Sequence, residues 1–371
     1  MTHPRPTHRD PGARPMVLTF VAPSTRHPSG GVAVVYEFAC AMARRGHAVH
    51  LLHGGFFQGE VRGLDDIEWF DFDAPLMHHF APDGMADDAV PDADVHFGLA
   101  ALRPSLRRIG LPVVMIQGYG MLGTELEAKS YRAPCPKVCV ATWLADIARG
   151  LGVPERELIH VPVGLRTEKY RLRRPIADRP PRIAYCYSAH RQKGASLALE
   201  IFDEVRTVVP EVEVTVFGAV APEHEIPDWM TYRTNPPQSE LVDEIYNQSQ
   251  VVLCTSEVEG FGLSSVEAMA CGAALVTTDN GGSGDYAIHG RTALVAPCGD
   301  RGALVDHVVT LLRDHRRCAE LATAGQHYVQ RFQWDRSGEL LEEFLVGYVA
   351  DPVRFGRPGA GEKAGAAADD G

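Results

Sequence analysis

The chain has 371 residues, of which 45% are hydrophobic and 23% are charged. At roughly 150 residues per domain this length predicts two domains, and the composition excludes a wholly disordered, collagen-like or disulfide-dense protein. Lys and Arg total 36 against 48 Asp and Glu, a formal charge of -12. Such a chain binds nucleic-acid backbones poorly, so we expect no nucleic-acid partner. Any phosphate should be bound locally, by a few cationic side chains or helix N-termini.

The ends and the cysteines indicate a cytoplasmic protein. Residues 1–14 lack the apolar core of a secretory signal, and no run approaches the 18 apolar residues of a transmembrane segment. The eight cysteines are scattered without zinc-ligand spacing, and we expect reduced thiols and no metal site. Residues 1–14 and 353–371 are low in apolar residues, which predicts disordered tails.

Between the tails, apolar strands alternate with helical patterns, as in α/β folds with parallel sheets. Residues 15–172 read as one Rossmann-like domain, with a helix at 32–46 and another near 143–152. Its strands are expected at 16–23, 47–54, 93–99, 112–118, 137–142 and 158–164. His78 and His79 fall on a predicted loop. Arg103 and Arg107 share a helical face that fits an anionic membrane or a plain solvated helix.

The pattern restarts after a proline- and arginine-rich linker at 171–181. Residues 173–336 read as a second Rossmann-like domain, followed by an amphipathic helix at 337–352. Its strands are expected at 182–188, 213–218, 251–256, 273–279 and 292–297, and its helices at 196–209, 239–249 and 300–314. The fold class is therefore α/β, with two doubly wound domains facing across a cleft, and ligands are expected at the carboxyl ends of the strands.

The stretch SEVEGFGLSSVEAMACG (256–272) carries the most chemistry. A strand ends, a loop with Gly260 and Gly262 follows, and a helix begins near Ser264. The N–H groups and dipole of a helix start attract an anion such as phosphate. Glu259 and Glu267 flank this start, and a carboxylate accepts hydrogen bonds from a sugar diol. Together these features predict a nucleotide-sugar site. The alternative is that Ser264 simply caps a structural helix.

The two glutamates, separated by seven residues within EGFGLSSVEAMACG, resemble the signature of glycosyltransferase family 4. Flanking segments at 30–49, 160–170 and 279–297 are similar to that family too, and the resemblance spans about residues 16–350. It implies a retaining GT-B enzyme that uses a nucleotide-sugar. Glu267 would bind the ribose and Glu259 the donor sugar. The donor-binding set is then Gly30, Gly31, Gly260, Phe261, Gly262, Leu263, Ser264 and Glu267.

Three further positions complete the predicted site. Arg191 and Lys193, after the first strand of the second domain, are expected to neutralise the diphosphate. The family has Arg five residues before its Lys, where this chain has Ser188, so Lys193 is the safer assignment. Gln117 ends a strand of the first domain, where many members of the family have His. An amide orients hydroxyls but does not titrate, which argues against a general base there.

The expected function is transfer of a sugar from a nucleotide-diphosphate-sugar to an acceptor hydroxyl, with Glu259, Arg191, Lys193 and Gln117 as catalytic residues. The nucleotide-sugar is a co-substrate, and neither a bound cofactor nor a metal is expected. The resemblance makes the first domain the acceptor domain, and it implies that the helix at 337–352 crosses back to pack on that domain. The acceptor is a natural product or a cell-surface glycan, lipid-linked or not, and peripheral membrane attachment stays open. The alternatives are a nucleotide-sugar epimerase of the same fold and a non-catalytic nucleotide-sugar-binding subunit.

Overall fold

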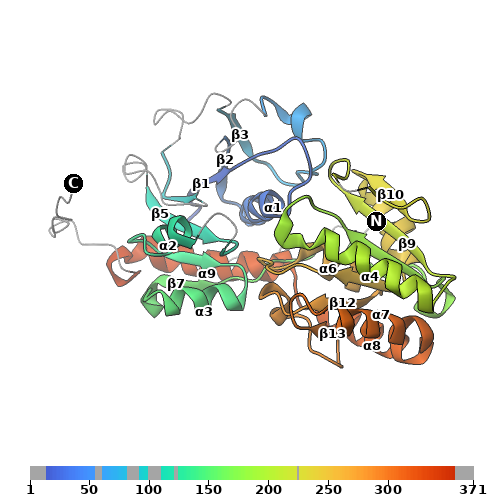
Figure 1. Cartoon of the computed structure of the whole chain (residues 1–371). Helices are drawn as coiled ribbons and strands as arrows, with labels where there is room; N and C mark the ends of the chain where they lie inside the picture. The colour runs from blue at the N-terminus through green and yellow to red at the C-terminus, as the bar shows by residue number, and fades with distance from the viewer. Residues whose placement is uncertain are drawn as a thin grey trace.

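The computed structural model describes residues 14–54, 61–81, 92–98, 110–120, 124–223 and 225–355 (Figure 1). The ranges predicted as tails lie outside these residues, apart from Arg14 and 353–355. Arg103 and Arg107 also lie outside them.

The first domain is built on a parallel sheet in the order β3-β2-β1-β4-β5-β6-β7. Its strands are β1 (Val17–Ala22), β2 (Ala48–His53), β3 (Met77–Phe80), β4 (Val95–Gly98), β5 (Leu111–Ile116), β6 (Lys137–Cys139) and β7 (Leu158–His160). Its helices are α1 (Gly30–Arg44), α2 (Thr124–Tyr131) and α3 (Thr142–Gly150), with single 3-10 turns at Leu64–Ile67 and Glu155–Glu157. Apolar, β-branched runs such as VLTFVA account for the central strands, which are buried on both faces.

The second domain repeats the architecture with a parallel sheet in the order β10-β9-β8-β11-β12-β13. Its strands are β8 (Arg182–Cys186), β9 (Glu213–Gly218), β10 (Thr231–Thr234), β11 (Val251–Cys254), β12 (Ala274–Thr278) and β13 (Ala293–Ala296). Its helices are α4 (Ala195–Val208), α5 (Gln238–Glu240), α6 (Leu263–Ala270), α7 (Arg301–Arg313) and α8 (His315–Val329). Two doubly wound domains are thus confirmed, each with the order reversal that places ligands at strand ends.

Three local expectations differ from the structure. The glycine pair Gly30 and Gly31 forms the first turn of α1 rather than a loop before it. His78 and His79 lie in the edge strand β3, which the polar sequence MHHF did not signal. The helix expected at 239–249 starts as α5, widens into a π turn over Leu241–Ile245 and ends as a 3-10 turn.

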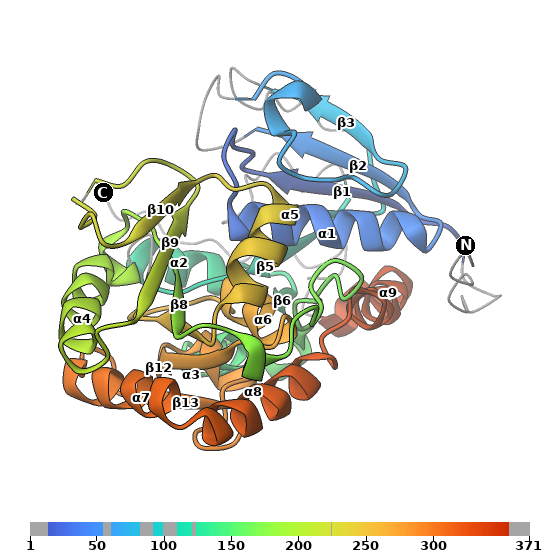
Figure 2. The ribbon, with the colours of Figure 1, turned by 90° about the vertical axis from the view of Figure 1, so that its right-hand side faces the viewer.

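The last long helix, α9 (Trp334–Ala350), packs on α1 of the first domain although it follows the second domain in sequence (Figures 1 and 2). The carboxylate of Glu342 accepts hydrogen bonds from Arg45 Nε at 2.6 Å and pairs with His47 Nε2 at 3.1 Å. The Tyr348 hydroxyl donates to the carbonyl of Pro112 at 3.1 Å. Packing continues through the 3-10 turn Pro352–Phe355, whose Phe355 ring meets the aromatic rings of α9.

The segment predicted as a linker is tied closely to the second domain. The buried guanidinium of Arg179 donates to the carbonyl oxygens of Tyr246, Ser249 and Cys271 at 3.0, 2.8 and 2.6 Å. Burial lowers the pKa of Arg179 to about 10. Because these carbonyls end α6 and the 3-10 turn Tyr246–Gln248, Arg179 fixes both elements against the chain entering β8.

Candidate active site

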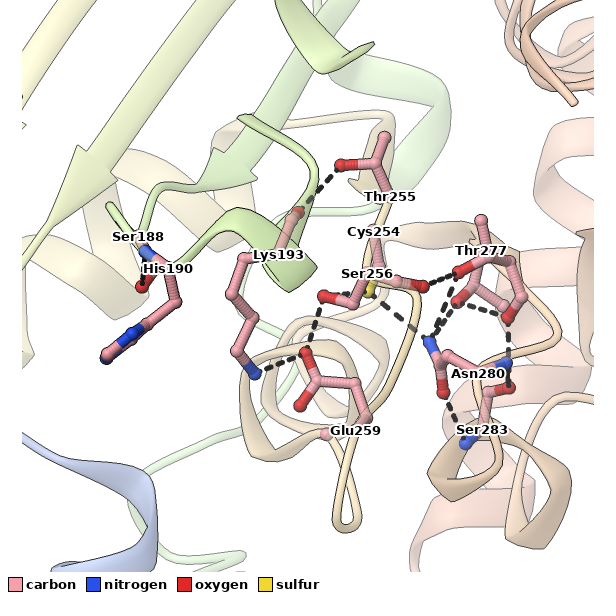
Figure 3. Close-up of polar contacts among 12 residues, drawn as sticks. Ser188, His190, Lys193, Cys254, Thr255, Ser256, Glu259, Thr277, Asn280 and Ser283 are labelled. Atoms are coloured by element: carbon pink, nitrogen blue, oxygen red, sulfur yellow. Dashed lines mark hydrogen bonds and ion pairs between the residues drawn. The ribbon is translucent and has the colours of Figure 1, made fainter. Parts of the chain in front are cut away.

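Glu259 lies in the loop between β11 and α6 and forms an ion pair with Lys193 (Figure 3). Its Oε1 lies 2.7 Å from Lys193 Nζ and accepts a hydrogen bond from the Ser256 hydroxyl at 2.7 Å. The side chains of Lys193 and Glu259 are 24% and 14% exposed. The pair is therefore partly shielded from water but still open to a ligand.

Lys193 is held in place by its backbone. It ends the 3-10 turn Arg191–Lys193 and precedes Gly194, whose positive φ of 70° favours glycine. The Thr255 hydroxyl bonds the carbonyl oxygens of Lys193 and Gly194, each at 3.0 Å. The turn after β8 is thus fastened to the end of β11. Arg191 is exposed at the start of the same turn.

The start of α6 forms an uncapped helix N-terminus beside this ion pair. Its N-cap, Gly262, has φ 97° and no side chain to cap the helix. A Cβ at Gly262 would overlap the Tyr286 hydroxyl, so glycine is required there by space as well as by φ. Phe261 is buried against the Tyr286 ring, whereas Leu263 and Ser264 at the helix start are partly exposed. An anion is the natural partner of such a helix start.

Glu267, one turn along α6, faces two tyrosines. Its Oε2 accepts a hydrogen bond from the Tyr246 hydroxyl at 3.2 Å, and the Tyr170 hydroxyl bonds the same carboxyl group. Burial raises the pKa of Glu267 to about 7 despite these donors. Both tyrosines were missed in the sequence. Tyr246 follows an irregular helix end, where a π turn often marks a functional site.

The loop after β12, which carries Asn280, is hydrogen-bonded to the backbone of Glu259 (Figure 3). The Glu259 N–H donates to the Asn280 carbonyl at 3.0 Å, and the Gly282 N–H donates to the Glu259 carbonyl at 3.1 Å. The Asn280 side chain reaches back to the hydroxyl of Thr277 at 3.3 Å and accepts from the Ser283 N–H at 3.0 Å. Asn280 is thus a supporting residue that sequence reasoning did not single out, although its segment was part of the resemblance.

The site residues predicted in the first domain meet those of the second. A Cβ at Gly260 would overlap the Gln117 carbonyl oxygen, and a Cβ at Gly31 would lie 3.3 Å from Gln117 Oε1. A Cβ at Gly30 would lie 3.6 Å from Leu263. The carboxyl end of β5, the start of α1 and the loop before α6 therefore converge at the domain boundary. The structure thus brings Gln117, Gly30 and Gly31 of the first domain against Gly260 and Leu263 of the second.

The family described as glycosyl transferases group 1 matches residues 166–328, which carry the Lys193–Glu259 pair and Glu267. The match therefore spans the second domain from the chain before β8 to α8. The expected resemblance to glycosyltransferase family 4 is confirmed.

The curated relatives of this chain are bacterial glycosyltransferases. A GDP-mannose-dependent alpha-(1-6)-phosphatidylinositol monomannoside mannosyltransferase of Mycolicibacterium smegmatis is 27% identical over 52% of this chain and 57% of its own length. A D-inositol 3-phosphate glycosyltransferase of Rhodococcus erythropolis is 32% identical over 29% of this chain and 25% of its own length. The chain thus matches less than two thirds of the length of either relative.

Solved structures extend the likeness in fold to both domains of the chain. Sucrose-phosphate synthase from Thermosynechococcus elongatus superposes with a TM-score of 0.72, covering 91% of this chain and all of that one at 16% identity. Anabaena HepE, solved in complex with UDP-glucose, superposes with a TM-score of 0.71 over 90% of this chain and all of that one, also at 16% identity. These neighbours confirm the GT-B architecture. Within the described ranges, none of the helices combines the length and apolar character that a bilayer span needs.

Proposed function

We propose that the protein is a retaining glycosyltransferase that moves a sugar from a nucleotide-diphosphate-sugar to an acceptor hydroxyl. The observation that carries this proposal is the Lys193–Glu259 ion pair beside the uncapped start of α6. A phosphate group would bind Lys193, and a sugar would bind Glu259. Lys193 and the helix N–H groups bind the diphosphate, and Glu259 accepts hydrogen bonds from the sugar hydroxyls.

Glu267 completes the donor site by binding the nucleotide ribose. Its carboxyl group already accepts hydrogen bonds from the Tyr246 and Tyr170 hydroxyls, so donors of the same kind satisfy it. A ribose diol offers two more hydroxyl donors in the geometry that a carboxylate accepts. Gln117, Gly30 and Gly31 border the site from the first domain and make room for the sugar and the acceptor.

In the proposed reaction, the bond between the sugar C1 and the diphosphate oxygen breaks as the acceptor oxygen bonds to C1 on the same face. The acceptor proton passes to an oxygen of the departing diphosphate. Lys193 exchanges Glu259 for this diphosphate and, with the α6 N–H groups, stabilises its developing charge. Electrostatic stabilisation of this kind substitutes for a bound metal ion, so the proposed enzyme needs neither a metal nor another cofactor.

The test begins with ligand-induced thermal shifts for UDP-glucose, GDP-mannose, dTDP-glucose and ADP-glucose. A donor at 100 times its dissociation constant adds about 2.7 kcal/mol of stability. With the donor that binds, Lys193→Met should lower turnover by about 10²–10³-fold, the cost of removing one preorganised charge-stabilising donor. Arg191→Met, two residues away and exposed, serves as the matched control and should cost less.

The outcomes separate the proposal from its alternatives. Release of free nucleotide with an altered sugar and no acceptor would identify an epimerase. Donor binding without turnover under any acceptor would indicate a binding subunit. Equal turnover in wild type and Lys193→Met would contradict the proposed role of Lys193.

A further inference from the structure

The N-terminus of α3 in the first domain is capped by a residue of the second domain. The N-cap residue of α3, Ala141, has no side chain that could accept a hydrogen bond. The Asp285 carboxylate takes that place, accepting from the Thr142 N–H at 3.0 Å through Oδ2 and 3.3 Å through Oδ1. His160 Nε2, also of the first domain, lies 3.9 Å from Oδ2. A carboxylate at a helix N-terminus also complements the helix dipole.

Trp143, the next residue of α3, contacts the loop between β11 and α6 that carries Glu259. Its indole Nε1–H donates to the carbonyl of Gly260 at 2.9 Å. Its ring covers Gly281, where a Cβ would lie 2.8 Å from the indole, so a side chain at 281 would displace the ring. One side chain of the first domain thus contacts both loops that shape the donor site.

These two loops are also bonded to each other at Glu259. Its N–H donates to the Asn280 carbonyl, and its carbonyl accepts from the Gly282 N–H. Trp143 bonds the carbonyl of Gly260, the residue that follows Glu259 in the first of these loops. Asp285 ends the 3-10 turn Gly282–Asp285 in the second loop. The backbone that carries the Glu259 carboxylate is therefore held by bonds within the second domain and, through the Gly260 carbonyl, by α3 of the first domain.

We propose that Trp143 and Asp285 form an interdomain latch that positions Glu259 for the donor sugar. This inference rests on the proposed function for its consequence, but the latch itself is a property of the protein alone. Both are positioning residues: Trp143 acts through the Gly260 carbonyl and Asp285 through α3. Domain opening would break both contacts at once and leave the Glu259 loop held only by its bonds within the second domain, so sugar binding is coupled to domain docking.

The experiment compares Trp143→Phe, which keeps an aromatic ring but loses the N–H donor, and Asp285→Asn, which keeps size but loses charge. The matched control is Trp229→Phe, whose indole stacks on Arg206 within the second domain, 4.5 Å from the ring centroid. Calorimetry measures the affinities for UDP, UDP-glucose, GDP and GDP-mannose. Hydrogen exchange measures the amides of residues 257–263 and 142–146 in the ligand-free protein.

With the nucleotide that binds, we expect the affinity for the nucleotide-sugar to fall about tenfold relative to that for the bare nucleoside diphosphate. A general loss of folding would lower both affinities together. Exchange at 257–263 and 142–146 should accelerate in both latch variants and stay unchanged in Trp229→Phe. Unchanged affinity ratios and unchanged exchange would overturn the latch. If the wild type binds none of these four ligands and neither dTDP-glucose nor ADP-glucose, the proposed function fails, and the exchange data alone decide the latch.

Discussion

The six strands of the second sheet follow the same order as the first six strands of the first sheet, yet the carboxyl ends of the strands carry different chemistry in the two domains. In the first domain, hydroxyl and imidazole groups form a neutral chain: Tyr36 donates to Ser24 at 2.6 Å, Ser24 lies 2.8 Å from His53 Nδ1, and His53 Nε2 lies 2.9 Å from His78. Burial lowers the pKa of His53 to about 3, which keeps it uncharged. The second domain carries charged groups at the equivalent edge. The shared topology decides where a ligand binds, and the side chains decide which ligand it is.

The domains also differ in how the chain completes them. The second sheet and its helices come from one continuous stretch, from Arg182 to Val329. The first domain needs α9, which arrives after the second domain and buries Leu341 and Leu345 completely. The sheet and helices of the second domain are therefore complete within one stretch of chain, whereas the first domain depends on the C-terminal end of the chain.

The largest expected effect tests this dependence. Leu345→Ala should destabilise the first domain by about 2–5 kcal/mol, because it leaves a cavity at a fully buried site. Hydrogen exchange in urea, followed on peptides of β1 and β11, measures each domain separately. The neighbouring Val346→Ala, at a position 39% exposed, should cost less than about 0.5 kcal/mol. Equal losses in both domains would mean that they unfold as one unit.

A second prediction concerns the charged groups of the second domain, at Glu267. Glu267→Gln should weaken UDP or GDP binding about tenfold or more at pH 8, since a hydrogen bond to a charged group contributes roughly 1.5–3 kcal/mol. With its pKa raised to about 7, wild-type Glu267 becomes protonated below that pH. Wild-type affinity should therefore fall between pH 8 and 5.5.

Calorimetry at several pH values between 5.5 and 8 measures how the nucleotide affinity changes with pH. The Glu267→Gln protein should show a flatter pH dependence, while Glu259→Gln keeps the wild-type slope. The raised pKa also means that the ionised carboxylate costs stability above pH 4.5. The Glu267→Gln protein should then be more stable than wild type at pH 8. A wild-type slope in both variants would remove Glu267 from the nucleotide site.

A third prediction concerns the neutral hydrogen-bonded chain of the first domain, at His53. Because the folded pKa of His53 is about 3 and its ordinary value is 6.5, the unfolded chain binds more protons between these values. The stability from neutral His53 is present above pH 6.5 and is lost as the pH falls. By pH 5 the loss reaches about 2 kcal/mol at 1.36 kcal/mol per unit. Denaturant unfolding at several pH values should show a shallower slope for His53→Gln than for exposed His327→Gln.

The smallest effect is expected from chelation. If Lys193 and the start of α6 neutralise the diphosphate, EDTA should leave the turnover of a bound donor unchanged. Enzyme assays with and without chelator, each followed by added magnesium or manganese, measure this. Complete loss that either ion restores would show that the charge at the site of the second domain is incomplete without a metal.

Much of the second domain was determined by local sequence. Buried apolar runs set β11 and β12, and a glycine in the left-handed region at Gly262 set the start of α6. Glu259, Lys193 and Glu267 could be predicted because each lies beside such an element. The polar strand β3 could not be, since edge strands lack the apolar pattern that marks central ones.

Only the tertiary structure decided how these groups meet. Nothing in the sequence near Trp143 or Asp285 indicates that Trp143 bonds the Gly260 carbonyl or that Asp285 caps α3, because each partner lies more than a hundred residues away and is a backbone group. Tyr170 reaches Glu267 for the same reason. Local patterns select helices, strands and glycine turns, whereas contacts between distant segments depend on how the two sheets pack.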